Sequence, residues 1–230
     1  MDTTPNVIAP VAPKHAEDTG LSPVMMRDIV LKTMFRTNLE QVSSLSVALA
    51  LPVSVTQDLI DKAREQGLVE ATGTLHAGAG SEMGFRLSDT GKSRALDALS
   101  QSEYYGAMPV PLEDYAEQVK RQSVRNMKVT RDALLGAMGH LILPPDLLDQ
   151  LGPAVGAGRS ILMYGPPGNG KSSISNGIRD ALGDLIYVPR AIEYNGSVIT
   201  VYDPLMHVKR EDPEDDVNAL RKTANRFDRR

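Results

Sequence analysis

The sequence predicts a mixed α/β protein with two domains, on the basis of three observations. Residues 165–172 read Gly-Pro-Pro-Gly-Asn-Gly-Lys-Ser and follow the apolar run Ile161–Tyr164. Between residues 21 and 100, three amphipathic segments with helix-start signals precede two short strand-like segments around a glycine-rich stretch. Residues 101–128 differ from both parts, because a Tyr/Pro-rich connector there leads into a polar segment. We therefore expect a first domain at 21–100, a linker and connecting helix at 101–128, and an α/β domain at 129–230.

Composition limits the class of protein. The 230 residues are 41% hydrophobic, which is enough for one large or two small packed cores. The chain has no cysteine, so it has no disulfide framework and no thiolate nucleophile or metal ligand. A net charge of -4 gives no general attraction to nucleic acid or to an anionic membrane surface. Without a signal-peptide pattern or an apolar run of spanning length, we expect a cytoplasmic location and no membrane contact.

The first helices are predicted from their end signals. Residues 1–20 hold three prolines among small and polar residues, and we expect a disordered tail there. Ser22 and Pro23 are typical of a helix start, with Ser22 as the N-cap and Pro23 in the first turn. The third helix, Val55–Gln66, should end at Gly67. Two residue pairs have the spacing of a capping box and predict the starts of the second and third helices: Asn38 with Gln41, and Ser54 with Gln57.

A hairpin and one more helix should complete the first domain. Leu68–Ala71 and Phe85–Leu87 are typical of short strands, and Thr90–Leu99 has the pattern of a helix. The sequence Gly-Leu-Val-Glu from residue 67, followed by Phe-Arg-Leu-Ser-Asp-Thr-Gly-Lys from residue 85, resembles the wing of MarR-like and PadR-like domains. The resemblance covers residues 21–100 and implies a winged helix, whose third helix usually reads the major groove of DNA.

The charges of this first domain do not suit DNA. Residues 21–100 hold eight Lys/Arg against nine Asp/Glu, and the stretch 72–84 offers only His76 and Glu82 where cations should meet phosphates. Phosphate neutralisation supplies most of the affinity in such complexes. We therefore expect the winged helix to contact an unidentified protein partner, and DNA binding is the alternative.

The connector and the next helices join the two domains. Tyr104–Pro111 predicts a rigid segment that packs across a domain junction, with a docking surface for a neighbour as the alternative. Leu112–Val124 predicts a polar helix. Val129–Leu143 and Pro145–Leu151 predict two helices that belong to the second domain.

Residues 165–172 have the pattern G-x-x-x-x-G-K-[ST] of a phosphate-binding loop. Its glycines let successive backbone N–H groups face inward, and the helix that follows, Ser172–Leu182, adds its positive N-terminal end. Lys171 should contact the β- and γ-phosphates and act in catalysis, and the Ser172 hydroxyl should ligate Mg²⁺. The nucleotide-binding residues expected are Gly165, Pro166, Pro167, Gly168, Asn169, Gly170, Lys171, Ser172 and Ser173.

The double-proline loop, from Gly165 to Ser172, resembles the Walker A loop of AAA+ ATPases. Asn169 and Ser172 stand where threonine is usual in that family, and serine supplies the same hydroxyl. The resemblance implies a three-layer α/β fold with a mostly parallel sheet, ATP and Mg²⁺ as cofactors, and hydrolysis that remodels a protein partner. It also implies ring or other homo-oligomeric assembly. The preference for ATP comes from this resemblance, although the chain also lacks the guanine-reading N-K-x-D pattern.

Other parts of the ATPase machinery are not plain in the sequence. Asp203 is a Walker B candidate after an apolar strand, but Asn195-Gly196 predicts a hairpin there, and Glu193 is a second acidic candidate. The charged segment Lys209–Arg230 predicts a helix end, with an arginine finger at Arg229 or Arg230 as the alternative. The segment after Lys171 is short for this family, and we expect a truncated or split member. The alternative functions are a nucleotide-responsive DNA-binding regulator and a nucleotide-binding fragment without turnover.

Overall fold

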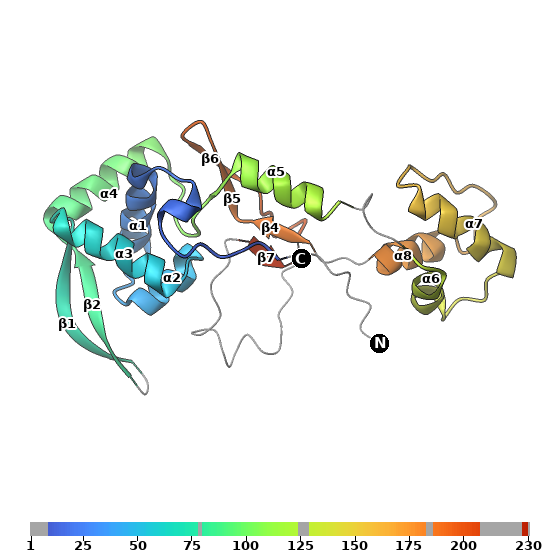
Figure 1. The fold of residues 1–230 in the computed structure, drawn as a ribbon, viewed down its shortest axis with the longest axis horizontal. Helices are drawn as coiled ribbons and strands as arrows, with labels where there is room; N and C mark the ends of the chain where they lie inside the picture. The colour runs from blue at the N-terminus through green and yellow to red at the C-terminus, as the bar shows by residue number, and fades with distance from the viewer. Residues whose placement is uncertain (1–8, 78–79, 124–128, 183–185, 208–226, 230) are drawn as a thin grey trace. The chain divides into compact units, whose positions relative to one another are not determined.

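The computed structural model describes residues 9–77, 80–123, 129–182, 186–207 and 227–229. The fold is mixed α/β, with helices and small sheets (Figure 1). The chain divides into two compact units. The N-terminal unit comprises residues 10–116 and 187–229, and the helical unit comprises residues 117–186 with the remaining terminal residues. This division differs from the expected domain at 129–230, since the segment from residue 187 onward belongs to the N-terminal unit.

In the N-terminal unit three helices precede a β-hairpin and a fourth helix follows it, in the order that the sequence predicts. The Ser22 hydroxyl accepts a hydrogen bond from the backbone N–H of Met25 at 3.2 Å, which confirms the predicted N-cap of the first helix. The hairpin strands are longer than expected and pair antiparallel from Val69 opposite Leu87 to Ala77 opposite Gly80. The elements are the 3₁₀ turn Glu17–Thr19, α1 (Pro23–Thr37), α2 (Val42–Leu49), α3 (Val53–Glu65), β1 (Val69–Ala77), β2 (Gly80–Leu87) and α4 (Asp89–Gln101).

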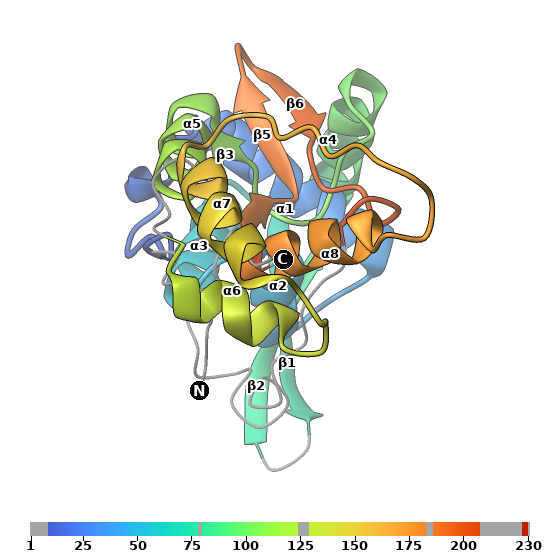
Figure 2. The same cartoon turned by 90° about the vertical axis from the view of Figure 1, so that its right-hand side faces the viewer.

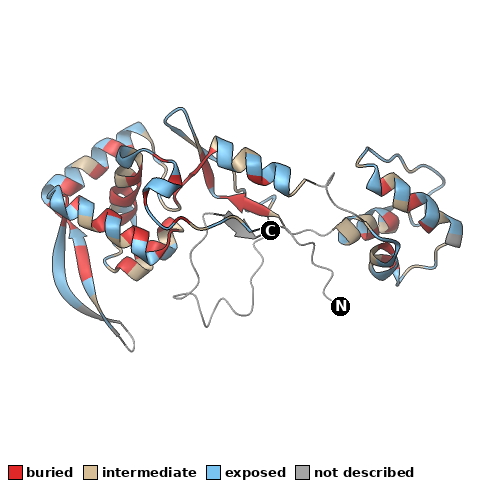
Figure 3. Cartoon of the chain, in the orientation of Figure 1, coloured by how far each residue is buried: buried red, intermediate tan, exposed pale blue. Residues whose placement is uncertain are grey.

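The core of the N-terminal unit forms around α1. Figure 3 shows buried residues concentrated on α1 and on the helices around it. Ile29 and Leu31 of α1 pack in one cluster with Leu45 of α2 and Ile60 of α3, and all four are at most 1% exposed. Burial of such side chains is the main stabilising contribution to this unit, at about 1.5–3 kcal/mol each.

The two predicted capping boxes are wrong. Asn38 has a φ of 52° and closes the C-terminus of α1, and α2 begins after Gln41 without a side-chain cap. The cap comes instead from the hairpin, because the Glu82 carboxylate accepts hydrogen bonds from the Ser43 backbone N–H at 2.8 Å and from its hydroxyl at 2.6 Å. Helix α3 begins directly after Pro52, whose fixed φ already suits a helix start.

The predicted disordered tail is wrong for the part that the structure describes. Ala16 and Thr19 are buried, and the Thr19 hydroxyl donates to the Ala16 carbonyl at 2.6 Å. The Asp18 carboxylate accepts the backbone N–H groups of His15 and Lys14, and these hydrogen bonds lower the pKa of Asp18. Residues 10–20 therefore pack as part of the N-terminal unit, and residues 1–8 lie outside the described residues.

The Tyr/Pro connector packs within the N-terminal unit. The Met108 N–H donates to the Leu49 carbonyl at 2.7 Å, and β3 (Val110–Pro111) pairs parallel with β5 (Ala191–Tyr194). Strand β5 pairs antiparallel with β6 (Ser197–Thr200), as the Asn195-Gly196 pair predicts. The φ values of 49° at Asn195 and 78° at Gly196 are those of a type I′ turn.

Two further strands belong to the N-terminal unit. Strand β4 (Tyr187–Pro189) pairs antiparallel with β7 (Phe227–Arg229). The C-terminal segment was predicted to end as a helix, but residues 227–229 form this strand. The rest of that prediction, residues 209–226 and Arg230, lies outside the described residues.

The helical unit contains no strand among its described residues. It consists of the end of α5 (Leu112–Arg121), α6 (Arg131–Met138), α7 (Pro145–Gly156) and α8 (Lys171–Leu182), and Figure 2 shows the last three together. Leu134 and Met138 pack against Leu148, Leu151 and Ile174 in its core.

The predicted strand Ile161–Tyr164 is not formed. Leu162 is 86% exposed and Tyr164 is 90% exposed. An apolar segment becomes a strand only when a neighbouring strand pairs with it. No strand is present beside it within the described part of its unit, so the parallel sheet implied by the ATPase resemblance is not seen there.

No single helix among the described residues is long and apolar enough to cross a membrane. Helices α2 and α3 reach that length and hydropathy only when counted together, across a bend of 109°.

Candidate nucleotide-binding loop

The loop 165–170 has the backbone conformation that its glycines allow. Gly165, Gly168 and Gly170 have φ values of 145°, 85° and 73°, a region that residues with a side chain rarely adopt. Pro166 and Pro167 lie between the first two of these glycines and fix the intervening backbone. The glycines are therefore required by the path of the chain rather than by a lack of space around them.

The loop presents free backbone donors at the start of a helix. Helix α8 begins at Lys171, and the Ile174 N–H donates back to the Gly170 carbonyl at 2.9 Å. Within the described residues, the backbone N–H groups from Gly168 to Ser173 donate no hydrogen bond. Unpaired N–H groups at a helix N-terminus attract anions, and the first turn of α8 contains no acidic residue that would oppose an anion.

The Lys171 side chain folds back over the loop. Its ammonium donates hydrogen bonds to the Gly165 carbonyl at 3.0 Å and to the Pro166 carbonyl at 2.6 Å. These two bonds hold the positive charge over the same loop that carries the free N–H groups. The positive charge of Lys171 and the positive end of the α8 dipole thus both attract an anion to this loop.

The remaining predicted site residues lie in the loop and in the first turn of α8. Asn169 and Ser172 are exposed, and Ser173 is half-buried in the first turn of α8. Ile174, in the first turn of α8 after the loop, is 8% exposed and packs in the core of the helical unit. This packing holds the C-terminal end of the loop against that core. A close approach of α8 to α6 adds to this support, because a Cβ on Gly177 would lie 2.6 Å from Met138 Cγ.

The two acidic candidates take part in local turns. Glu193 accepts the N–H of Gly196 at 2.7 Å within its own hairpin. Asp203 accepts the N–H of Leu205 at 2.9 Å, and its own N–H donates to His207 Nδ1 at 3.1 Å. Both residues belong to the N-terminal unit, whereas the loop belongs to the helical unit. The structure therefore does not join either carboxylate to the loop within one compact unit.

No cluster of three or more His, Asp or Glu side chains suited to a metal ion occurs in the part of the chain that the structure describes. Ser172, the predicted Mg²⁺ ligand, is exposed in the first turn of α8. No protein-family model matches the chain. Searches of curated proteins and of solved structures also found no match.

Proposed function

We propose that the chain binds a nucleoside triphosphate, as Mg²⁺ complex, at residues 165–173. The observation that supports this is the combination of free N–H groups from Gly168 to Ser173 with the Lys171 ammonium above the same loop. A polyphosphate is the anion that suits a row of donors followed by a single cation. The resemblance to AAA+ ATPases favours ATP as the nucleotide.

The residues of the loop have distinct roles in this proposal. The backbone N–H groups hold the phosphates, Lys171 contributes charge to the β- and γ-phosphates, and the Ser172 hydroxyl ligates Mg²⁺. Bound Mg²⁺ neutralises phosphate charge. Lys171 must leave the Gly165 and Pro166 carbonyls to reach a phosphate, so nucleotide binding should exchange these two hydrogen bonds for bonds to negatively charged phosphate oxygens.

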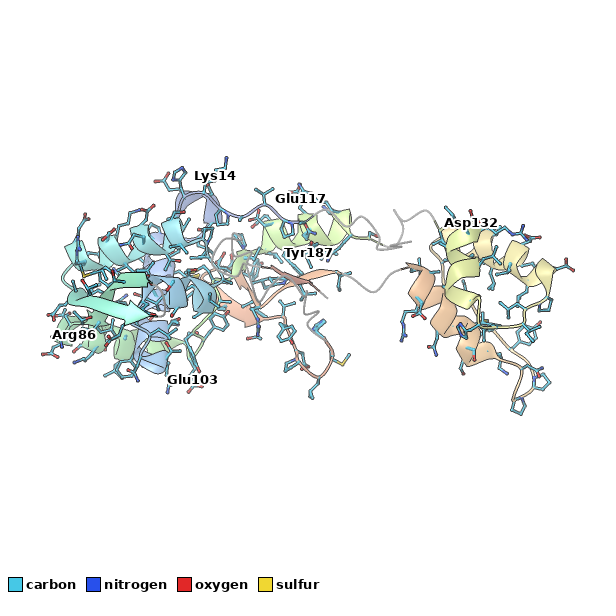
Figure 4. The ribbon with its side chains drawn as sticks, turned by 90° about the horizontal axis from the view of Figure 1, so that it is seen from below. Lys14, Arg86, Glu103, Glu117, Asp132 and Tyr187 are labelled. Atoms are coloured by element: carbon cyan, nitrogen blue, oxygen red, sulfur yellow. The ribbon has the colours of Figure 1, made fainter. Side chains whose placement is uncertain are left out.

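We also propose that residues 21–100 form a winged helix that contacts a protein, so that nucleotide binding or hydrolysis remodels that partner. The order of three helices, a hairpin and a fourth helix supports the winged helix. Two contacts disfavour DNA as the partner. Glu82 occupies the N-terminus of α2, and the exposed Arg86 of the hairpin (Figure 4) faces Glu70 at 3.5 Å.

Binding of a series of adenine compounds tests the proposed loop. With Mg²⁺ present, ATP and ADP should bind at least about 100-fold more tightly than AMP, and adenosine should not bind measurably. The reason is that the donors of the loop contact phosphates rather than the base. Isothermal titration of the full chain measures the four affinities. Equal affinity for AMP and ATP would contradict a polyphosphate site.

The alternative of a nucleotide-responsive DNA-binding regulator has its own test. We expect no binding of a random 30-base-pair duplex by the full chain at physiological salt, with or without ATP. The balance of charges leaves few cations to neutralise phosphates. Fluorescence anisotropy at two salt concentrations measures this. Binding that weakens steeply with salt and changes with ATP would favour the regulator.

A further inference from the structure

A cleft lies in the N-terminal unit, and none of its lining residues belongs to the phosphate loop. It is lined by α1, the end of α4 and the turn of the β5–β6 hairpin, and has a volume of about 480 Å³. A small organic molecule of several heavy atoms fits such a volume. Its lining combines apolar side chains of α1 with hydroxyl groups at Ser22, Ser102 and Ser197.

Lys32 of α1 lines this cleft and is almost completely buried. The residue is only 4% exposed, and its ammonium donates one hydrogen bond, to the Ser102 carbonyl at 3.1 Å. An ammonium has three N–H donors. In the described part of the chain, no carboxylate lies within 4.0 Å of it. Buried lysines are normally paired with an anion, so this one lacks its usual partner.

The carboxylate one turn earlier on α1 is already engaged. Asp28 accepts two hydrogen bonds from Arg94, at 3.2 and 2.8 Å, and two from Arg27, at 3.1 and 3.0 Å. Burial lowers the pKa of Lys32, and the charge of Asp28 opposes that change. Lys32, Arg27 and Arg94 carry three positive charges. Asp28 carries one negative charge, so this group of four residues has a net charge of +2 beside the cleft.

We propose that this cleft binds a small organic acid, with the acid's carboxylate accepting hydrogen bonds from the Lys32 ammonium. The apolar side chains of Val24, Met25 and Ile29 provide contacts for an aliphatic body. A monoanion suits the cleft better than a phosphate, because Lys32 is the cation among the described lining residues, whereas Arg27 and Arg94 are bonded to Asp28. Ser22, at the start of α1, and Ser197, in the β5–β6 hairpin, also line the cleft.

Hexanoate and hexanamide form a matched pair of probes for this cleft, because they share size and shape and differ in charge. The full chain should bind hexanoate at least about tenfold more tightly than hexanamide. Lys32→Met removes the charge and keeps an unbranched stem, so it should abolish that preference. Lys92→Met, which removes an exposed lysine of α4, should leave it unchanged. Isothermal titration gives the affinities, and circular dichroism checks that each variant is folded.

Three further measurements test the position of the site and the source of the carboxylate. The ¹³Cε resonance of Lys32 should titrate at higher pH when hexanoate is bound, because a bound anion stabilises the ammonium. Val198→Trp should weaken hexanoate binding at least about tenfold by filling the cleft, without replacing the lysine. A short peptide with a free C-terminus is compared with its amidated form.

The outcomes are distinct. Hexanoate binding that depends on Lys32 and moves its ¹³Cε titration supports the proposal. Equal binding of hexanoate and hexanamide, or binding that survives in Lys32→Met, overturns it. Binding of the free peptide without binding of hexanoate also overturns it, in favour of a peptide C-terminus. Because Lys32 and Lys171 belong to different units, Lys171→Ala should leave hexanoate binding intact, so failure here is separate from failure of the nucleotide proposal.

Discussion

Lys171→Ala is expected to weaken ATP binding roughly 100-fold, as an ammonium that contacts two phosphates contributes charge-assisted hydrogen bonds. The backbone N–H groups of the loop stay in place in this variant, so some residual affinity should remain. The same substitution also removes the hydrogen bonds to the Gly165 and Pro166 carbonyls, which hold the loop in the absence of nucleotide. Titration of ATP into both proteins, with Mg²⁺ present, measures the difference.

Two control variants separate a local effect from a general loss of charge. Arg179→Ala removes one exposed cation from the same helix α8, where the arginine pairs with Asp180, and should change ATP affinity by no more than about twofold. Lys171→Arg keeps the charge but places a larger planar group over the loop, and it should recover only part of the affinity. An unchanged ATP affinity in Lys171→Ala would contradict the proposed site.

Turnover by the same proteins distinguishes the enzyme from the binding fragment. Mg²⁺-dependent ATP hydrolysis that disappears in Lys171→Ala would establish an ATPase and would require a water-activating acid. Glu193 and Asp203 are then the residues to replace, although each is engaged in a turn of the N-terminal unit. Binding that depends on Lys171 without hydrolysis would favour the non-hydrolysing alternative.

Sequence patterns predicted the structure well where residues close together in the chain determine the backbone conformation. Asn195-Gly196 predicted the hairpin because the turn depends on two positive φ values. Ser22 predicted the start of α1 because the cap bond reaches only three residues along the chain. The glycines at 165, 168 and 170 predicted the loop for the same reason: their φ values are a local property.

Sequence patterns did not predict features of the structure that depend on residues far apart in the chain. Helix α2 is capped by Glu82, which lies 39 residues from Ser43, and no spacing rule links the two. Lys32 meets the Ser102 carbonyl 70 residues away, and its sequence signal is only a lysine directly after the apolar run Ile29–Leu31. Ile161–Tyr164 has the composition of a strand, but strand formation depends on a pairing partner rather than on the segment itself.

Gly91→Ala is expected to destabilise the N-terminal unit by about 3 kcal/mol. Gly91 is buried in the first turn of α4, and an added Cβ would lie 2.0 Å from the Leu68 carbonyl oxygen and 2.9 Å from its carbonyl carbon. Both atoms are backbone, so a rotamer change cannot relieve the contact. The backbone around Leu68 must shift, and it leads directly into β1.

The position of Leu68 makes that shift costly. Its carbonyl accepts the N–H of Ser88 at 3.0 Å, and the Ser88 hydroxyl in turn accepts the Gly91 N–H at 3.0 Å and donates to the Gly67 carbonyl at 2.7 Å. A displaced Leu68 therefore weakens the N-cap of α4 together with the junction between the hairpin and that helix.

Urea unfolding, combined with hydrogen exchange of the β1 and β2 amides, measures the effect on this unit. Ser93→Ala is the matched control, because Ser93 is exposed on the same helix and its hydroxyl donates to the Asp89 carbonyl within its own turn. It should change the free energy of unfolding by no more than about 0.5 kcal/mol. If Gly91→Ala were as stable as Ser93→Ala, the close packing of α4 on Leu68 would be wrong. The winged-helix proposal would then lose the support of this close approach between the start of the hairpin and the fourth helix.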